Sequence, residues 1–191
     1  MATTELQTAT RPQPGTYEID PSHSQVSFSA RHLMVSKVRG SFAVTGGSIV
    51  IAEDTEQSHV EATVDAQSVT SGDAKRDEHL RSADFFAVEQ YPTISFRSTK
   101  LDDHGDGTFT LDGDLTVRDV THPVRLEGEY LGTETAPWGT TSIGFSAETE
   151  VNRKDWGVEW NVALETGGVL VSEKVKLVID VEAVVPQADA S

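Results

Sequence analysis

The segment TFTLDGDLTVRDVTHPVRLEGEY, residues 108–130, shows a pattern that recurs through the chain. Its first half places apolar or small residues at every second position: Phe109, Leu111, Gly113, Leu115 and Val117. Its second half does the same: Val124, Leu126, Gly128 and Tyr130. Since side chains alternate between the two faces of a strand, this spacing predicts two strands, each with one apolar face. The polar stretch 119–123 predicts the turn that joins them as an antiparallel pair.

The same alternation occurs in six further places, so the sequence predicts eight strands. The alternating runs lie at 26–30, 42–51, 60–64, 94–96, 109–117, 124–130, 143–147 and 175–181. In the second run the apolar parity changes at Gly46 and Gly47, which indicates a bulge within one long strand. Only residues 71–88 resemble a helix, with Ser71 or Asp73 as the N-cap.

Eight long antiparallel strands fit either a β-sandwich or a closed up-and-down barrel. Small residues on the apolar faces favour a barrel with an open lumen: Ala30, Ala62, Gly113, Gly128 and Ala147. Tight packing at these points is the alternative. We predict an all-β, eight-stranded antiparallel barrel with one short helical segment around residues 71–88.

Length and composition limit the domain count and the class of partner. The 191 residues correspond to one domain, which we place at 15–185 between a disordered tail at 1–14 and a loose tail at 186–191. The net charge of −16 argues against nucleic-acid binding and against polybasic docking on a membrane. The chain has no cysteine, which excludes disulfides and thiolate chemistry.

Two further features of the sequence bear on location. No stretch of about 18 apolar residues is present, so we expect no integral membrane span. The N-terminus has neither a basic start nor an apolar run, so we expect no secretory signal and a cytoplasmic protein.

Four motifs, in order, resemble the YceI-like family, and the resemblance runs from about residue 15 to 185. They are GTYEIDPSHSQVSFSARHLMVSKVRGSF at 15–42, VTSGDAKRDEHLRSADFFAVEQYPTISFRS at 69–98, GDLTVRDVTHPVRL at 113–126 and NRKDWGV at 152–158. The resemblance implies a lipocalin-like, extended antiparallel barrel. It also implies a cavity for a polyisoprenoid lipid, either an isoprenoid quinone or a polyprenyl lipid. We therefore expect non-enzymatic binding, storage or transport of such a lipid. Since relatives are often dimeric, a homodimer is a further expectation.

We predict twelve ligand-binding residues on the apolar faces and at the ends of the barrel. Those on or next to strands are Val26, Phe28, Ala30, His32, Phe42, Val44, Phe96, Leu115 and Phe145. The others, Phe85, Trp156 and Trp160, lie outside the long strands. Together with Phe86, they would either plug one barrel end or form a satellite cluster beneath a loop. The helical segment would cover a mouth as a lid, fixed by an ion pair between Arg76 and Asp77.

The polar residues show no pattern typical of catalysis or of a metal site. His23 and His32 are nine residues apart, whereas zinc ligands use tighter local spacing. Ser24, Asp77 and His79 could be drawn as a triad, but no G-x-S-x-G elbow surrounds any serine. We expect no catalytic residue, no metal and no cofactor. The alternatives are an enzyme acting on an isoprenoid or other apolar substrate, and a sugar-binding β-sandwich.

Overall fold

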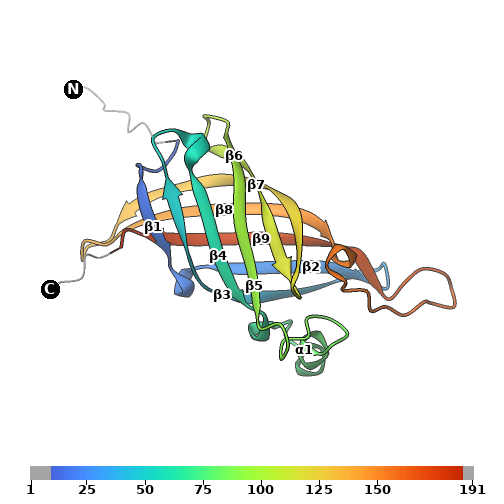
Figure 1. Cartoon of the computed structure of the whole chain (residues 1–191). Helices are drawn as coiled ribbons and strands as arrows, with labels where there is room; N and C mark the ends of the chain where they lie inside the picture. Colours follow the sequence, from blue (N-terminus) through green and yellow to red (C-terminus); the bar gives the residue numbers. More distant parts are fainter. Residues whose placement is uncertain (1–9, 187–191) are drawn as a thin grey trace, which may run out of the picture.

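The computed structural model describes residues 10–186, in which an antiparallel sheet closes on itself (Figure 1). Its strands are β1 (Gly15–Ile19), β2 (Gln25–His32), β3 (Ser36–Ile51), β4 (His59–Asp65), β5 (Thr93–Asp103), β6 (Thr108–Val117), β7 (Val120–Thr135), β8 (Thr141–Asn152) and β9 (Val171–Val184). The helices are α1 (Ala74–Arg81) and the short 3-10 helices η1 (Pro21–His23), η2 (Thr55–Gln57), η3 (Ala66–Ser68) and η4 (Arg153–Trp156).

The strands form a ring in the order β3, β2, β9, β8, β7, β6, β5 and β4, and pairing of β4 with β3 closes it. β1 pairs with the far ends of β3 and β9, the same two strands that flank β2. β1 and β2 therefore occupy one strand position, which η1 interrupts. The eight-stranded antiparallel barrel is confirmed, with the correction that its first position is split. Closure excludes the β-sandwich alternative.

The interruption between β1 and β2 has a local cause in the sequence. Pro21 has no backbone N–H, so it cannot donate to a sheet ladder. The Asp20 carboxylate accepts a hydrogen bond from the backbone N–H of Ser22 at 2.8 Å, which turns the chain into η1. The two halves of the strand then pair with β3 in slightly different registers.

The turn between β6 and β7 is shorter than the sequence predicts. It consists of Arg118 and Asp119, with φ of 52° and 62°, the positive values that a two-residue type I′ hairpin requires. Residues 120–123, predicted as turn, continue the pairing as part of β7. Their polar and proline composition is typical of turns, but the register of the apolar residues on both strands decides the pairing.

The predicted bulge in β3 is confirmed. The β3–β4 register shifts by one residue between Val44 and Gly46, and β3 continues for 16 residues through both glycines. Gly46 and Gly47 have φ of 151° and 148°, values that only glycine adopts readily. The bulge allows one strand to bend and keep its pairing on both sides.

The helical segment lies against one end of the barrel, next to the start of β5 (Figure 1), and Thr70, which precedes it, pairs with Ser41 within β3. α1 begins after Asp73, whose carboxylate accepts hydrogen bonds from the first turn, and it ends at Arg81. The predicted segment 71–88 is thus helical only in its middle, and the remainder forms turns. Leu80 and Phe85 are buried in the main core, so this segment belongs to the packed body of the protein.

The predicted ion pair between Arg76 and Asp77 is wrong, because both side chains bind Ser71. The Asp77 carboxylate accepts from the backbone N–H of Ser71 at 2.7 Å and from its hydroxyl at 2.5 Å. Arg76 donates to the Ser71 hydroxyl at 2.7 Å and to its carbonyl at 2.9 Å. Adjacent residues on a helix do not face each other, so the two side chains meet at a third residue.

We expect Asp77→Ala to lower the free energy of unfolding by about 2 kcal/mol at pH 7, because the half-buried N–H and hydroxyl of Ser71 lose a charged acceptor. Hydrogen bonds from Ser71 lower the pKa of Asp77 below its ordinary value. The stabilisation is therefore present above that ordinary pKa and is lost as the pH falls through the lowered one. Urea unfolding at pH 7 and at acidic pH measures both effects. The exposed neighbour Glu78→Ala is the control, and an equal loss in both variants would contradict the assignment.

The expected terminal tails are described only in part. Residues 1–9 and 187–191 lie outside the described residues. Within the expected N-terminal tail, Pro12 is buried and the Tyr17 hydroxyl donates to the Gln13 carbonyl at 2.8 Å. This part of the chain therefore lies against the barrel.

Candidate ligand-binding cavity

The inward faces of the strands surround a cavity of about 780 Å³. This volume falls within the range of roughly 300–1,000 Å³ that is typical of small-molecule sites. Its wall is largely apolar, because alternation along each strand sends the polar residues outward. A wall of this kind favours an apolar ligand, because removing apolar surface from water lowers the free energy and such a ligand needs few polar partners.

All twelve residues predicted to bind ligand line this one cavity. β2 contributes four of them: Val26, Phe28, Ala30 and His32. β3 contributes Phe42 and Val44, and β5, β6 and β8 contribute Phe96, Leu115 and Phe145. Phe85 follows α1, Trp156 ends η4, and Trp160 follows it. Their contact with a ligand stays a prediction.

The small residues on the apolar faces divide into two groups. Ala30, Ala62 and Ala147 line the cavity, as expected for an open lumen. Gly113 instead lies beneath the ring of Phe96, where a Cβ atom would come within 2.5 Å of Cε2. Gly128 lies in the same way beneath Phe109. These two glycines allow large rings to lie flat on the wall, so tight packing explains them.

The aromatic residues at the α1 end form two groups of ring contacts. The rings of Phe85 and Trp160 lie 5.4 Å apart, and the His79 ring lies 4.6 Å from Trp160. Phe42 contacts Phe86 edge to face at 5.1 Å. Both groups pack on the main core, so neither is a satellite cluster beneath a loop. Together they form one end of the cavity wall.

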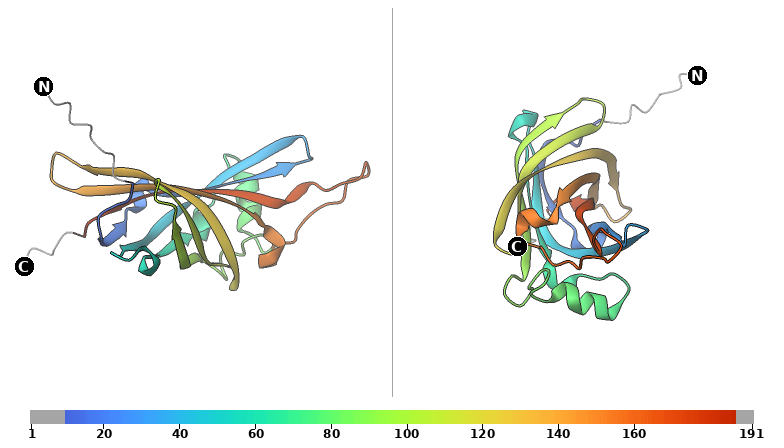
Figure 2. Two further views of the ribbon diagram at one scale, coloured as in Figure 1. Left: turned by 90° about the horizontal axis from the view of Figure 1, so that it is seen from above. Right: turned by 90° about the vertical axis from the view of Figure 1, so that its right-hand side faces the viewer.

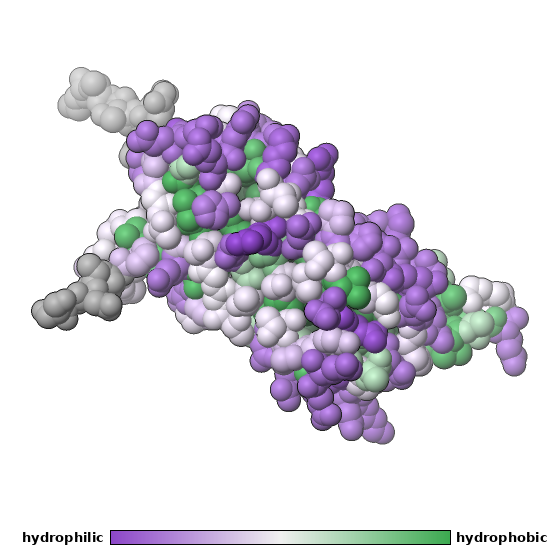
Figure 3. All heavy atoms as spheres, in the orientation of Figure 1, coloured by the Kyte–Doolittle hydropathy of each residue, from purple (hydrophilic) through white to green (hydrophobic). Residues whose placement is uncertain are grey.

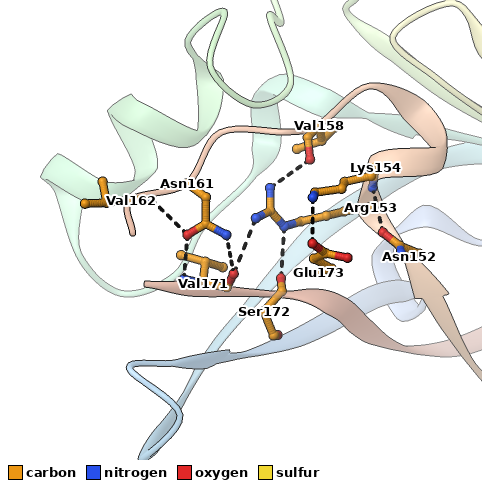
Figure 4. Close-up of polar contacts among 9 residues, drawn as sticks. All are labelled: Asn152, Arg153, Lys154, Val158, Asn161, Val162, Val171, Ser172 and Glu173. Carbon is orange, nitrogen blue, oxygen red and sulfur yellow. Dashed lines mark hydrogen bonds and ion pairs between the residues drawn. The ribbon is translucent and has the colours of Figure 1, made fainter. Parts of the chain in front are cut away.

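Trp156 and Arg153, both in η4, fix a second part of the wall. The indole N–H of Trp156 donates to the Leu115 carbonyl at 2.9 Å. Arg153 is buried and donates to the carbonyls of Val158 at 2.7 Å and Ser172 at 2.9 Å (Figure 4). Burial lowers the pKa of its guanidinium from the ordinary value. Arg153 thereby holds the start of β9 against the segment that follows η4.

Several further residues line the cavity that the twelve do not include. Examples from the strands are Ile49, Val60, Ile94, Phe109, Leu111, Leu126, Tyr130 and Val181. Most continue the same period-two alternation, so the pattern could have found them. Arg153 and His79 also line it, and no local pattern predicts that these polar residues line the cavity.

Ser24, Asp77 and His79 do not assemble into a catalytic triad. The Ser24 hydroxyl donates to the Glu182 carbonyl at 3.2 Å and accepts from its N–H at 3.1 Å. His79 contacts the Asp84 carboxylate at 2.8 Å, and Asp77 binds Ser71. Each group is thus engaged with a different partner.

Asp20, His23 and Glu182 carry three possible metal-ligand atoms within 4.8 Å of one another, on the outside of the barrel. Hydrogen bonds from Ser22 and His23 lower the pKa of Asp20 to about 2, and the bond to Asp20 raises the pKa of His23. Capping of η1 by Asp20 accounts for this arrangement.

The sequence of this chain is similar to the sequences of known proteins. A family model described as a YceI-like domain matches residues 17–183. Protein YceI of Escherichia coli O157:H7 is 37% identical over 171 residues, which cover 88% of this chain and 86% of that protein. A UPF0312 protein of Azotobacter vinelandii is 36% identical with the same coverage.

Solved structures share the fold. BcnA of Burkholderia cenocepacia superposes with a TM-score of 0.71 at 18% identity, covering 86% of this chain and 98% of that one. A polyisoprenoid-binding domain from Saccharophagus degradans gives 0.65 at 14% identity, covering 91% and 100%. Within residues 10–186, no helix has the length and apolar character needed to cross a membrane.

Proposed function

The chain belongs to the YceI-like domain family, and from this membership we propose that it binds a polyisoprenoid lipid inside its barrel without converting it chemically. The observation that carries the proposal is the apolar cavity of about 780 Å³, onto which all twelve predicted residues converge. The described binding of polyisoprenoids by the Saccharophagus degradans domain supports it. The quinone or polyprenyl identity, the storage or transport role, the homodimer and the cytoplasmic location stay predictions.

The binding free energy of such a lipid would come mainly from its contact with the apolar wall of the cavity. Each CH₂ group removed from water contributes about 0.8 kcal/mol, so one five-carbon unit contributes up to about 3–4 kcal/mol. Several units would exceed the practical ceiling of about 18–21 kcal/mol, so the cost of ordering the chain must offset part of this gain. Affinity should therefore rise with chain length and level off once the cavity is full.

Two measurements test the proposal. Native mass spectrometry of protein gently extracted from its source should show a bound lipid of polyisoprenoid mass. Titration with geraniol, farnesol and geranylgeraniol should give an affinity that increases at least about tenfold with each added isoprene unit. A bare protein together with affinities that ignore chain length would contradict the proposal.

The enzyme alternative makes a different prediction for Ser24 and His79. We expect hydrolysis of generic esters and phosphate esters to be no faster than without protein. The Ser24 hydroxyl hydrogen-bonds to the main chain of Glu182 and His79 to the Asp84 carboxylate, so the hydroxyl and the imidazole are not paired as nucleophile and base. Ser24→Ala and His79→Ala should leave these rates unchanged. Turnover above background that disappears in either variant would favour an enzyme.

A further inference from the structure

The hairpin between β2 and β3 presents bulky apolar side chains to solvent at an unfavourable turn. Leu33, Met34 and Val35 are 40%, 56% and 84% exposed. Leu33 and Met34 are the central residues of the turn, with φ of 51° and 62°, and the N–H of Val35 donates to the His32 carbonyl at 3.1 Å. Two positive φ values favour Asn-Gly rather than Leu-Met. The turn at Leu33 and Met34 is therefore strained, and its exposed side chains are apolar.

The stretch of chain that contains this tip has a charge opposite to that of the whole protein. Residues 21–52 contain no aspartate or glutamate, although the chain has 31 acidic residues. The same stretch contains Arg31, Lys37 and Arg39, all exposed, and no salt bridge found within residues 10–186 involves them. It carries +3, and the remaining residues carry −19, from 12 basic and 31 acidic residues.

A second exposed apolar segment lies beside the hairpin. The N–H of Leu33 donates to the Leu170 carbonyl at 2.9 Å, which joins the tip to the loop before β9. That loop, residues 157–170, exposes Val162 to 46% and includes two carboxylates, Glu159 and Glu165. Figure 3 shows hydrophobic residues gathered at this end of the molecule. His32, Lys37, Trp160 and Leu170 also line the cavity, so tip and loop border the cavity.

We propose that the β2–β3 tip, residues 33–35, together with its flanking cations Arg31, Lys37 and Arg39, docks on an anionic lipid bilayer. The apolar tip would enter the interface while the cations contact lipid phosphates. Its role in collecting lipid rests on the proposed function, since a polyisoprenoid dissolved in a bilayer must reach the cavity across its bordering end. The net charge of −16 does not oppose this, because charges farther away than about 8–10 Å are screened in physiological salt.

The test is flotation of the full chain with vesicles of phosphatidylcholine and phosphatidylglycerol at 7:3. The protein should float with these vesicles and bind pure phosphatidylcholine vesicles much more weakly. Leu33→Asn combined with Met34→Gly should reduce partitioning more than about tenfold. Because Asn-Gly suits the turn, the same variant should raise the thermal midpoint by about 2–4 °C. Lys37→Gln and Arg39→Gln should each weaken binding about fivefold.

The matched control is Trp138→Asn, which removes an 81%-exposed apolar side chain from the β7–β8 hairpin at the opposite end (Figure 2, left). It should float like the wild type. Wild-type protein that stays off anionic vesicles, or a tip variant that floats normally, would overturn the proposal. So would a tip variant that changes only the oligomeric state, since the tip would then contact a second copy.

A separate titration distinguishes this proposal from the proposed function. The tip variant should bind geranylgeraniol in solution, without vesicles, as tightly as the wild type does. Wild-type binding to geranylgeraniol but not to vesicles would overturn only the docking surface. Wild-type binding to vesicles but to no isoprenoid would support docking and contradict the proposed function.

Discussion

Replacing Ala30 with tryptophan is expected to weaken isoprenoid binding about a hundredfold while the barrel stays folded. Ala30 lies in β2, lines the cavity, and pairs with Val38 and Val175, which line it too. An indole ring at this position would occupy space that the ligand needs. Displacing one isoprene unit removes up to about 3 kcal/mol, so the affinity should fall by about two orders of magnitude.

The matched control for Ala30→Trp is Ser29→Trp, one residue away on the outward face of the same strand. Ser29 borders a separate outer hollow, so the same ring should leave isoprenoid affinity unchanged. Overpacking of a filled core usually costs about 1–3 kcal/mol, whereas an open lumen has room for the added ring. A large fall in the thermal midpoint of Ala30→Trp with normal lipid binding would mean that this face is solid core.

Gly47→Ala is expected to cause a large loss of stability, because two separate costs coincide there. At φ 148° any side chain strains the backbone, at about 1–3 kcal/mol. The added Cβ would also press on backbone atoms of β4, closest to the Glu61 carbonyl oxygen and 2.8 Å from the Cα of Ala62. Backbone in a paired strand yields little, so overpacking adds about 1–3 kcal/mol. The total is about 2–6 kcal/mol in urea unfolding at pH 7.

Gly46→Ala separates the two costs. Gly46 has a similar φ of 151°, but a Cβ there would meet no atom within 4 Å. This variant should therefore show the backbone cost alone, roughly half the loss of Gly47→Ala. Equal losses in the two variants would mean that contact with β4 does not limit position 47.

The sequence predicts the barrel well where alternation is long. β6 and β7 each show at least four alternating apolar or small residues. β6 forms where expected, and β7 contains the expected run 124–130 but extends beyond it at both ends. β1 is missed because Tyr17 and Ile19 are only two such residues, and Asp20–Pro21 separates them from the next run. The cavity wall is predictable for the same reason as the strands. The period-two alternation that identifies a strand also identifies its inward face, and in a barrel the inward residues line the lumen.

The polar parts of the site are not predictable in this way. The partners of Arg153 are main-chain carbonyls of residues 158 and 172, which the fold brings together without any sequence signature. Arg76 and Asp77 suggest an ion pair by charge, yet the helix directs both toward Ser71. The β2–β3 tip lies between the predicted runs 26–30 and 42–51, and Leu33, Met34 and Val35 include none of the Gly, Asn or Asp residues that signal a tight turn.

Closure of the ring through β2 and β9 has a consequence for the order in which the chain folds. Ser24, just before β2, bonds to Glu182 in β9, 158 residues further on. At a synthesis rate of about 5–20 residues per second, β9 is synthesised roughly 8–30 s after β2. During this time the edge of β2 that pairs with β9 has no partner. Until then that edge is free to pair with another chain. We expect refolding to be slow for a protein of this size, because the contact between Ser24 and Glu182 joins residues 158 positions apart.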